Sequence, residues 1–263
     1  MIPFLLGLHI PIVVSERNNP WIRPINKVNR VLRRIFYRFA DGYVFQTKEA
    51  RSFFSKKIQN TSTIILNPLD LTRLPKSFPE VREKRVVAVG RLDTQKNHDL
   101  LIRAFAQFYK RYPEYKLDIY GNGDEKENLS QLAKSLLPHE SYMFYEPTNE
   151  VLFEINNAAM FVLSSDYEGL PNALIEAMSI GLPCISTDCP SGGPRELIKS
   201  GINGILVPVN NDTELTNAMI KIAEDKEFSR VLGNNAYNIR NLVETNKIIH
   251  EWSKYLESKC KKS

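Results

Sequence analysis

Two cations stand in a short segment whose residue types suit the binding of a diphosphate. Residues 90–97 (GRLDTQKN) follow an apolar run, and Gly90 at their start permits a close backbone approach. Arg91 and Lys96 lie just ahead of an expected helix, whose first backbone amides also attract negative charge. A solvated loop with two ordinary surface charges is the alternative interpretation of the same residues.

The segment 164–178 (SSDYEGLPNALIEAM) carries two carboxylates, one on each side of a predicted helix start. Glu168 lies in the loop before the helix, where the ligands of parallel sheets gather. Glu176 lies about one turn inside the helix in an apolar stretch, so its carboxylate needs a hydrogen-bonding partner. Two adjacent sugar hydroxyls would supply that partner, and so would a neighbouring Lys or Arg. The backbone at the helix start also suits a phosphate, and its four residues are Gly169, Leu170, Pro171 and Asn172.

Two further segments are weaker candidates, because each also suits a plain turn. Residues 121–124 (GNGD) place Gly121 and Gly123 where a nucleotide could lie against bare backbone, without the GxGxxG pattern of dinucleotide sites. Residues 188–196 (DCPSGGPRE) place paired glycines before a short helix, where a serine and an arginine could touch an anionic ligand.

These four segments follow predicted strands in a chain where strands and helices alternate almost throughout. Such alternation predicts parallel sheets built from right-handed crossover units, whose ligands collect at the carboxyl ends of the strands. Two series of strands are expected, at 10–15, 42–46 and 62–66, and then at 85–89, 115–120, 141–145, 160–164, 184–187 and 204–209. Helices are expected at about 22–40, 48–58, 98–112, 124–137, 149–157, 171–180, 193–199, 212–225, 227–243 and 245–258.

The two series of strands predict two domains of unequal completeness. The second series forms a complete doubly wound, Rossmann-like domain, whereas three strands with two helices are about half of one. A stretch with three prolines and many charges separates the two series. We therefore expect a partial N-terminal domain at 1–70, a linker at 71–84, a complete domain at 85–243 and a final helical segment at 244–263.

Composition excludes several classes of protein. The 263 residues are 43% hydrophobic and 25% charged, which is typical of a folded domain, and no apolar run reaches the roughly 18 residues of a membrane span. The opening MIPFLLGLHIPIVV lacks a basic leader and contains two prolines, which disfavours a signal peptide. The three cysteines form no CxxC and have no His at metal-ligand spacing, so no metal site is expected and a reducing cytosol fits.

Positive charge is concentrated in one part of the chain. The formal net charge is +5, and residues 17–40 hold seven Lys or Arg without Asp or Glu, so the rest of the chain sums to 5 − 7 = −2. Such local basicity disfavours nucleic-acid binding over a broad face. Residues 22–40 also repeat apolar and basic side chains on opposite sides of a helix, which suits an anionic membrane surface. An ordinary surface helix with its apolar face against the core is an equal alternative.

Taken together, these motifs resemble the retaining glycosyltransferases of family 4, which have the GT-B fold. GRLDTQKN is similar to a loop of that family, Glu168 and Glu176 have the spacing of its E-x7-E motif, and GLPCISTD, GGPRELI and NGILVP resemble the segments that follow. The resemblance covers about 85–225, while residues 10–70 resemble the last part of the family's acceptor-binding N-terminal domain. It implies an α/β chain of GT-B type, with a final helix near 245–258 that crosses back to the N-terminal domain.

The resemblance also implies how a nucleoside-diphosphate sugar, most commonly of uridine diphosphate, would bind. Arg91, Lys96 and Glu168 form the implied catalytic set: the two cations would hold the diphosphate as the sugar leaves, and Glu168 would contact the sugar. Glu176 would accept hydrogen bonds from the ribose hydroxyls. No metal, other cofactor or protein nucleophile is implied. The other implied donor-binding residues are Gly90, Gly121, Gly123, Gly169, Leu170, Pro171 and Asn172.

The implied function is transfer of a sugar to a saccharide or polyprenyl-linked acceptor during cell-surface polysaccharide synthesis, in the cytoplasm and peripheral on the inner face of the cell membrane. The chain departs from the family in two ways: the family's first strands and Gly-rich loop are expected to be missing, and Arg17 stands where many relatives have His. Two alternatives follow: a catalytically silent nucleotide-sugar-binding module that needs the missing half, or another GT-B enzyme such as an epimerase or a glycogen-type synthase. The E-x7-E pair with the Arg/Lys loop disfavours the epimerase.

Overall fold

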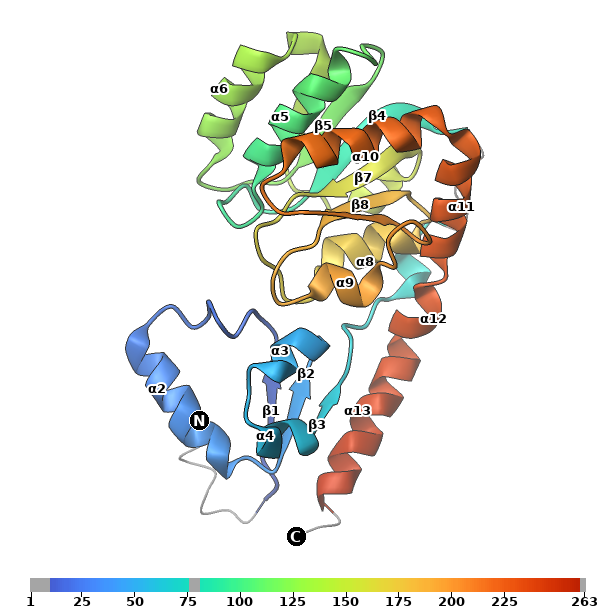
Figure 1. Cartoon of the computed structure of the whole chain (residues 1–263). Coiled ribbons are helices and arrows are strands. Elements are labelled where there is room, and N and C mark those ends of the chain that lie inside the picture. The colour runs from blue at the N-terminus through green and yellow to red at the C-terminus, as the bar shows by residue number, and fades with distance from the viewer. Residues whose placement is uncertain (1–9, 76–80, 261–263) are drawn as a thin grey trace.

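Two parallel β-sheets form the framework of the computed structural model, which describes residues 10–75 and 81–260. Figure 1 shows the smaller sheet in the N-terminal part of the chain and the larger sheet in the C-terminal part. The strand pairs that make up both sheets are parallel, as the alternation of strands and helices predicts. Parts of the predicted terminal segments and linker, at 1–9, 76–80 and 261–263, lie outside the described residues.

The N-terminal unit (residues 10–70) is built on a three-stranded sheet in the order β1-β2-β3. Its strands are β1 (Val13–Glu16), β2 (Gly42–Phe45) and β3 (Ser62–Ile64). Its helices are α2 (Lys27–Phe36), α3 (Lys48–Ser52) and α4 (Lys56–Asn60), with a 3-10 turn at Tyr37–Phe39. β2 is the central strand of this sheet and is buried along its whole length.

The helix expected at 48–58 is instead two short helices, α3 and α4, which are separated by a turn. The ring of Phe54 stacks on Tyr37 with centroids 5.7 Å apart, and the ring of Phe53 meets Trp21 edge to face at 5.1 Å. Successive side chains of a continuous helix point about 100° apart. The turn between α3 and α4 relaxes this constraint, so both rings can reach their partners. Aromatic packing between distant segments therefore overrides the local helical pattern.

The C-terminal unit (residues 83–243) is built on a six-stranded sheet in the order β6-β5-β4-β7-β8-β9. Its strands are β4 (Glu83–Val89), β5 (Lys116–Tyr120), β6 (Tyr142–Tyr145), β7 (Ala158–Leu163), β8 (Cys184–Thr187) and β9 (Ile205–Val207). The chain runs outward from β4 to β6 and then places β7 on the other side of β4, so the strand order reverses between β4 and β7. Open α/β sheets bind their ligands outside the carboxyl ends of the strands at such a switch point. Residues 90–97 and 164–172 follow these two strands.

Helices cover both faces of the larger sheet (Figure 1). One hydrophobic core lies under α5 and α10, where Phe105 and Phe108 are fully buried, and the other lies under α8 with Leu174 and Met178. The helices are α5 (His98–Tyr109), α6 (Lys126–Leu136), α7 (Val151–Ile155), α8 (Asn172–Ser179), α9 (Gly193–Leu197), α10 (Asp212–Glu224), α11 (Lys226–Tyr237) and α12 (Arg240–Val243). A sheet covered on both faces explains why its strands are continuous apolar runs.

The helix α13 (Thr245–Cys260) returns to the N-terminal unit and lies along its sheet (Figure 1). Ile248 of α13 is buried against Val44 and Ile65. The Tyr255 hydroxyl accepts a hydrogen bond from the backbone amide of Tyr43 at 2.8 Å, which ties the helix to β2. Within the described residues, no helix is both long and apolar enough to cross a membrane.

Candidate active site

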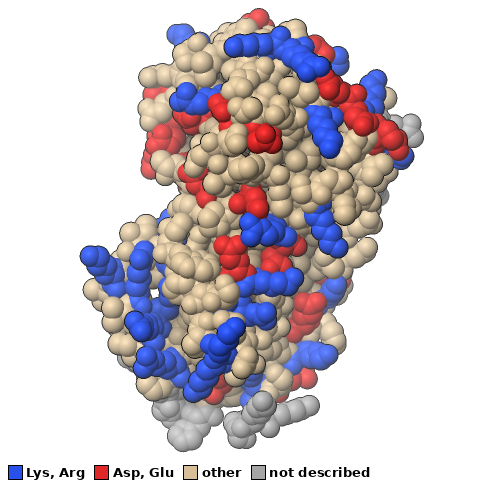
Figure 2. Space-filling model, viewed as in Figure 1, with Lys and Arg blue, Asp and Glu red and all other residues tan. Residues whose placement is uncertain are grey.

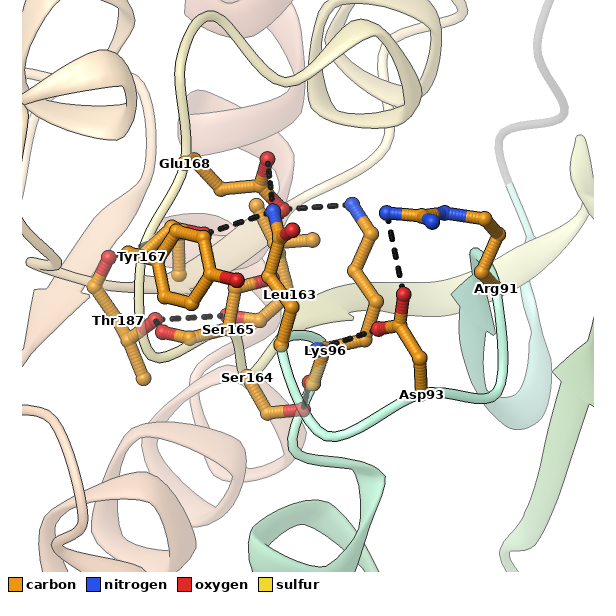
Figure 3. A network of polar contacts seen from close by, with 11 residues as sticks. Arg91, Asp93, Lys96, Leu163, Ser164, Ser165, Tyr167, Glu168 and Thr187 are labelled. Atoms are coloured by element: carbon orange, nitrogen blue, oxygen red, sulfur yellow. Dashed lines mark hydrogen bonds and ion pairs between the residues drawn. The ribbon is translucent and has the colours of Figure 1, made fainter. Parts of the chain in front are cut away.

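The loops after β4 and β7 meet through an ion pair between two predicted site residues. The ammonium Nζ of Lys96 lies 2.6 Å from Oε1 of Glu168, and the two side chains are only 13% and 7% exposed. The Ser165 hydroxyl donates to the same carboxylate oxygen at 2.7 Å. Figure 3 shows these groups converging from two separate loops. Sequence analysis therefore assigned both charged residues to one site. It did not predict their direct contact or the hydrogen bond from Ser165.

Hydrogen bonds to backbone carbonyls lock the two loops together. The Gln95 side-chain amide donates to the carbonyl of Tyr167 at 3.0 Å, and the Ser164 hydroxyl donates to the carbonyl of Lys96 at 2.9 Å. From the adjacent strand β8, the Thr187 hydroxyl donates to the carbonyl of Ser165 at 2.5 Å. The Lys96–Glu168 pair is thus held by a rigid polar frame, whose members are small polar residues without a distinctive spacing.

Arg91 stands at the exposed side of this pair. Its side chain is 67% exposed, and its guanidinium lies 3.0 Å from a carboxylate oxygen of Asp93. In Figure 3 the heads of Arg91 and Lys96 lie next to one another, with Glu168 beyond Lys96. Two neighbouring cations, one buried and fixed and one exposed and long, can bind a diphosphate from two directions.

The two glycines predicted after β5, Gly121 and Gly123, have a structural reason for being small. A Cβ atom at Gly121 would overlap the carbonyl oxygen of Gly90, and one at Gly123 would overlap that of Leu92. The two loops are joined by backbone hydrogen bonds from Gly90 to Tyr120 at 3.0 Å and from Leu92 to Asn122 at 2.9 Å. Glycine at these positions lets loop 121–124 lie directly on the loop of Arg91. That these glycines also contact the donor stays a prediction.

The loop 169–172 leads into α8, with Pro171 at the N-cap and Asn172 as the first helical residue. The first amides of a helix have no partner within it, so this end can accept an anion. Leu170 is buried, which anchors the loop in the core. Asn172 is exposed, and its Oδ1 accepts a hydrogen bond from Asn67 Nδ2 at 2.6 Å. The loop therefore lies between the two units of the chain.

Glu176 lies half-buried on α8. Within residues 10–75 and 81–260 its carboxylate has no hydrogen bond or ion pair, so the structure gives no support to a neighbouring Lys or Arg as its partner. Burial raises the pKa of Glu176 above its ordinary value. A half-buried carboxylate without a protein partner is suited to accept hydrogen bonds from a ligand.

The segment 188–196 faces the N-terminal unit. Arg195 is ion-paired with Asp188 at 2.7 Å and approaches Glu49 of α3 at 3.5 Å, so its charge serves the contact between the units. Ser191 is fully buried and donates a hydrogen bond to the carbonyl of Glu168 at 2.7 Å. Of the two residues of this segment that could touch a ligand, one is therefore ion-paired and the other supports Glu168.

The strands of the N-terminal unit also point toward this site with their carboxyl ends. Residues that follow β1, β2 and β3 all contact the C-terminal unit: the carbonyl of Arg17 packs against Gly169, the hydroxyl of Thr47 contacts residue 191, and Asn67 bonds Asn172. The Arg17 guanidinium reaches Asn67 Oδ1 at 3.3 Å. The carboxyl ends of the two parallel sheets thus face each other, the loop of Glu168 lies at this junction, and the loop of Arg91 contacts that loop through Lys96.

This arrangement can bind a diphosphate and stabilise negative charge on it. Lys96, Arg91 and the first amides of α8 are donors to an anion, while Glu168 and Glu176 are acceptors for hydroxyl groups. In the described part of the chain, no group of three or more His, Cys, Asp or Glu side chains is arranged to hold a metal ion. These donors and acceptors are the kinds of group that a ligand with a diphosphate and several hydroxyls would need.

Known proteins that are similar to this chain include glycosyltransferases. The sequence profile of the family described as glycosyl transferases group 1 matches residues 72–239, and the chain belongs to this family. An uncharacterized glycosyltransferase of Haemophilus influenzae is 32% identical over 230 residues, which cover 85% of this chain and 64% of that protein. A Campylobacter jejuni protein, GalNAc-alpha-(1->4)-GalNAc-alpha-(1->3)-diNAcBac-PP-undecaprenol alpha-1,4-N-acetyl-D-galactosaminyltransferase, is 29% identical over 95% of this chain and 69% of its own length.

Solved structures share the arrangement of both units. The structure of Anabaena Alr3699/HepE in complex with UDP and glucose superposes with a TM-score of 0.86 at 19% identity, over 98% of this chain and 74% of that one. Staphylococcus aureus TarM superposes with a TM-score of 0.79 at 20% identity, over 94% of this chain and 50% of its own. The predicted GT-B fold class is confirmed. The chain spans 64% of the Haemophilus relative and half of the TarM chain.

Proposed function

We propose that the chain transfers a sugar, with retention of its anomeric configuration, from a uridine-diphosphate sugar to a saccharide or polyprenyl-linked acceptor in cell-surface polysaccharide synthesis. The buried Lys96–Glu168 pair beside Arg91, at the switch point of the larger sheet, is the observation that carries this proposal. The named activity of the Campylobacter relative, which acts on an undecaprenol-linked saccharide, supports the acceptor class. The UDP in the Anabaena complex supports the nucleotide.

In the proposed reaction, Arg91 and Lys96 bind the diphosphate and stabilise the charge that develops as the bond to the sugar breaks. Glu168 accepts a hydrogen bond from a sugar hydroxyl, and Glu176 accepts from the ribose. The Glu168 carboxylate already receives bonds from Lys96 and Ser165, which makes it a positioned acceptor and a poor nucleophile. We therefore assign retention to substitution on the same face of the sugar, without a covalent intermediate on the protein.

Titration calorimetry with uridine diphosphate and a panel of its sugars tests the donor site. Arg91→Ala should weaken binding by about 1.5–3 kcal/mol, roughly 10- to 150-fold, through loss of a charge-assisted hydrogen bond. Arg230→Ala is a matched control, since Arg230 is a similarly exposed arginine paired with Glu227 on α11. Unchanged binding by the Arg91→Ala/Lys96→Ala double variant would show that the site lies elsewhere.

A catalytically silent nucleotide-sugar-binding module is the second candidate, because transfer needs groups held on both sides of the cleft. The two candidates differ in one measurement, which is release of uridine diphosphate in the presence of a lipid-linked saccharide acceptor. The first candidate predicts sustained release of uridine diphosphate, whereas the silent module predicts donor binding with little or no release. Sustained turnover by the purified monomer would contradict the silent module.

We also propose that α2 docks on an anionic membrane, as its pattern in the sequence suggested. Among the described residues no residue of α2 is buried, which supports this proposal over an apolar face packed on the core. Its apolar side chains point to solvent in one stripe, with Val28 63%, Val31 57% and Ile35 45% exposed. Lys27 and Arg34 lie beside this stripe at helical spacing. Figure 2 shows Lys and Arg gathered on this face of the N-terminal unit.

One cation of the basic segment does not belong to the docking surface. The Arg33 side chain is 10% exposed and donates to the carbonyls of Arg23 at 2.7 Å and Pro20 at 2.8 Å. It holds α2 to the unit, and the exposed cations act on the membrane. Each cation near an anionic surface contributes about 1 kcal/mol, which holds a protein loosely and in a salt-dependent way.

Sedimentation with vesicles tests the docking surface of α2. Wild type should pellet with phosphatidylglycerol vesicles and remain in solution with phosphatidylcholine vesicles. Lys27→Glu/Arg34→Glu and Val31→Ser/Ile35→Ser should each abolish pelleting, while Arg230→Glu on α11 should not. Equal pelleting of all these proteins would remove the membrane role and with it the proposed location on the inner face of the cell membrane.

A further inference from the structure

We propose that Thr47 positions Glu168, so that contact between the two units sets the geometry of the carboxylate that meets the sugar. The inference rests on the proposed donor site and deepens it, because it assigns control of that site to a residue of the other unit. Thr47 follows β2 and has no charge or motif that marks it in the sequence.

The Thr47 hydroxyl joins the two units in the buried part of their contact. It accepts a hydrogen bond from the amide of Ala50 at 2.9 Å, which caps α3. Its single proton is donated across the junction to the carbonyl of Ser191 at 2.6 Å. Thr47 and Ser191 are both fully buried, so water cannot replace this bond without a rearrangement.

The segment that receives this bond holds both backbone polar groups of Glu168. The Ser191 hydroxyl donates to the carbonyl of Glu168 at 2.7 Å. The carbonyl of Pro190 accepts a hydrogen bond from the amide of Glu168 at 3.1 Å. A continuous series of bonds therefore runs from Thr47 through residues 190–191 to Glu168.

Close packing prevents the loop of Glu168 from moving independently of its neighbours. A Cβ atom at Gly193 would overlap the carbonyl oxygen of Gly169, and one at Gly169 would lie 2.6 Å from the carbonyl oxygen of Arg17. The loop is thus enclosed between residues 190–193 and the N-terminal unit. Interiors packed this closely transmit a displacement instead of absorbing it.

A shift of Glu168 should affect the parts of the ligand unequally. Glu168 would contact the sugar, whereas Arg91 would contact the diphosphate and Glu176 the ribose. Neither of these two lies on the series of bonds that begins at Thr47, and of the groups assigned to the diphosphate only Lys96 contacts Glu168, through its ion pair. A small shift of Glu168 should therefore weaken recognition of the sugar more than recognition of uridine diphosphate, since binding groups must be placed within a fraction of an ångström.

The test compares the dissociation constants of uridine diphosphate and of UDP-glucose or UDP-N-acetylglucosamine, whichever binds wild type more tightly. Thr47→Val keeps the shape of the side chain and removes its hydroxyl. It should weaken binding of the nucleotide sugar about fivefold and change binding of uridine diphosphate less than about twofold. Thr47→Ser, which restores the hydroxyl, should restore the ratio. Glu49→Gln is the matched control, because it loosens the 3.5 Å ion pair with Arg195 at the same junction without touching residues 190–191.

Other outcomes separate this inference from the proposed function. Equal weakening of both ligands in Thr47→Val, or no change in either, would overturn the role of Thr47 and leave the donor site standing. Failure of wild type to bind uridine diphosphate at all would overturn the donor site and this inference together. If Thr47→Val does not fold, Ser191→Ala breaks the next bond in the series and should give the same sugar-selective loss. An unchanged ratio in a folded Ser191→Ala would overturn the inference.

Discussion

Replacing Lys96 by Met removes one partner of a buried ion pair and keeps most of the volume of its side chain. The Glu168 carboxylate, 7% exposed, then loses an ammonium 2.6 Å away. Loss of one partner of a buried pair costs about 3–5 kcal/mol, because the other charge stays buried without compensation. Ser165 still donates to the carboxylate at 2.7 Å, so we expect the lower end, about 3 kcal/mol. For a chain of this size that corresponds to a fall in Tm of about 6–12 °C.

The matched control is Arg91→Met in the same loop. The Arg91 side chain is 67% exposed, and its ion pair with Asp93 is therefore worth at most about 1 kcal/mol. Both variants should lose affinity for uridine diphosphate, but only Lys96→Met should lose much stability. The double variant Lys96→Met/Glu168→Gln should recover most of the lost stability, since it removes the buried charge as well.

Thermal and urea denaturation without ligand measure these differences directly. A fall in Tm for Lys96→Met that is no larger than the fall for Arg91→Met would refute the reasoning, because it would mean that the pair is hydrated or absent. A double variant as unstable as Lys96→Met alone would refute it as well, since the cost would then come from packing and not from an uncompensated charge.

Three further predictions concern other parts of the structure. Burial raises the pKa of Glu176, and ribose hydroxyls would bond to its ionised form. Binding of UDP-glucose should therefore release protons, and its affinity should increase as the pH rises through that pKa. Calorimetry in two buffers should detect the proton release, and Glu176→Gln should abolish it. The Cβ of Gly193→Ala would overlap a backbone oxygen, so this variant should lower the free energy of unfolding by about 1–3 kcal/mol or more. Gly201→Ala has open space around its Cβ but a φ of 80°, so it should lower that free energy by only about 1 kcal/mol. Urea denaturation measures both changes. Tyr255→Phe should lower stability by about 1–3 kcal/mol, because it removes the acceptor of the Tyr43 amide and the donor to the Thr61 carbonyl, with no effect on affinity for uridine diphosphate.

Sequence reasoning found the larger sheet because its strands are apolar runs of the length that a sheet covered on both faces requires. The strand predicted at 184–187 has the bounds of β8, and those predicted at 85–89 and 115–120 agree with β4 and β5 within two residues. Lys96 and Glu168 could be placed at one site because each follows a strand, and the ends of parallel strands share an edge.

The residues that support the site could not be found in the same way. Ser165 and Thr187 are ordinary polar residues whose partners are fixed by the register of strands, and Thr47 contacts a residue 144 positions away in the chain. Arg33 looked like one more surface cation, yet its guanidinium lies over the ring of Phe53 at 5.0 Å. Pairings between distant segments leave no local pattern, so they become visible only in the folded chain.

The position of α13 bears on the order in which the chain can be completed on the ribosome. Tyr255, whose hydroxyl bonds the backbone of β2, follows Tyr43 by 212 residues. At about 5–20 residues per second, some 10–40 seconds separate the two during translation. The C-terminal unit has its own two hydrophobic cores, so its folding does not depend on the synthesis of α13. We therefore expect the small sheet to stay open to chaperones until α13 has been synthesised.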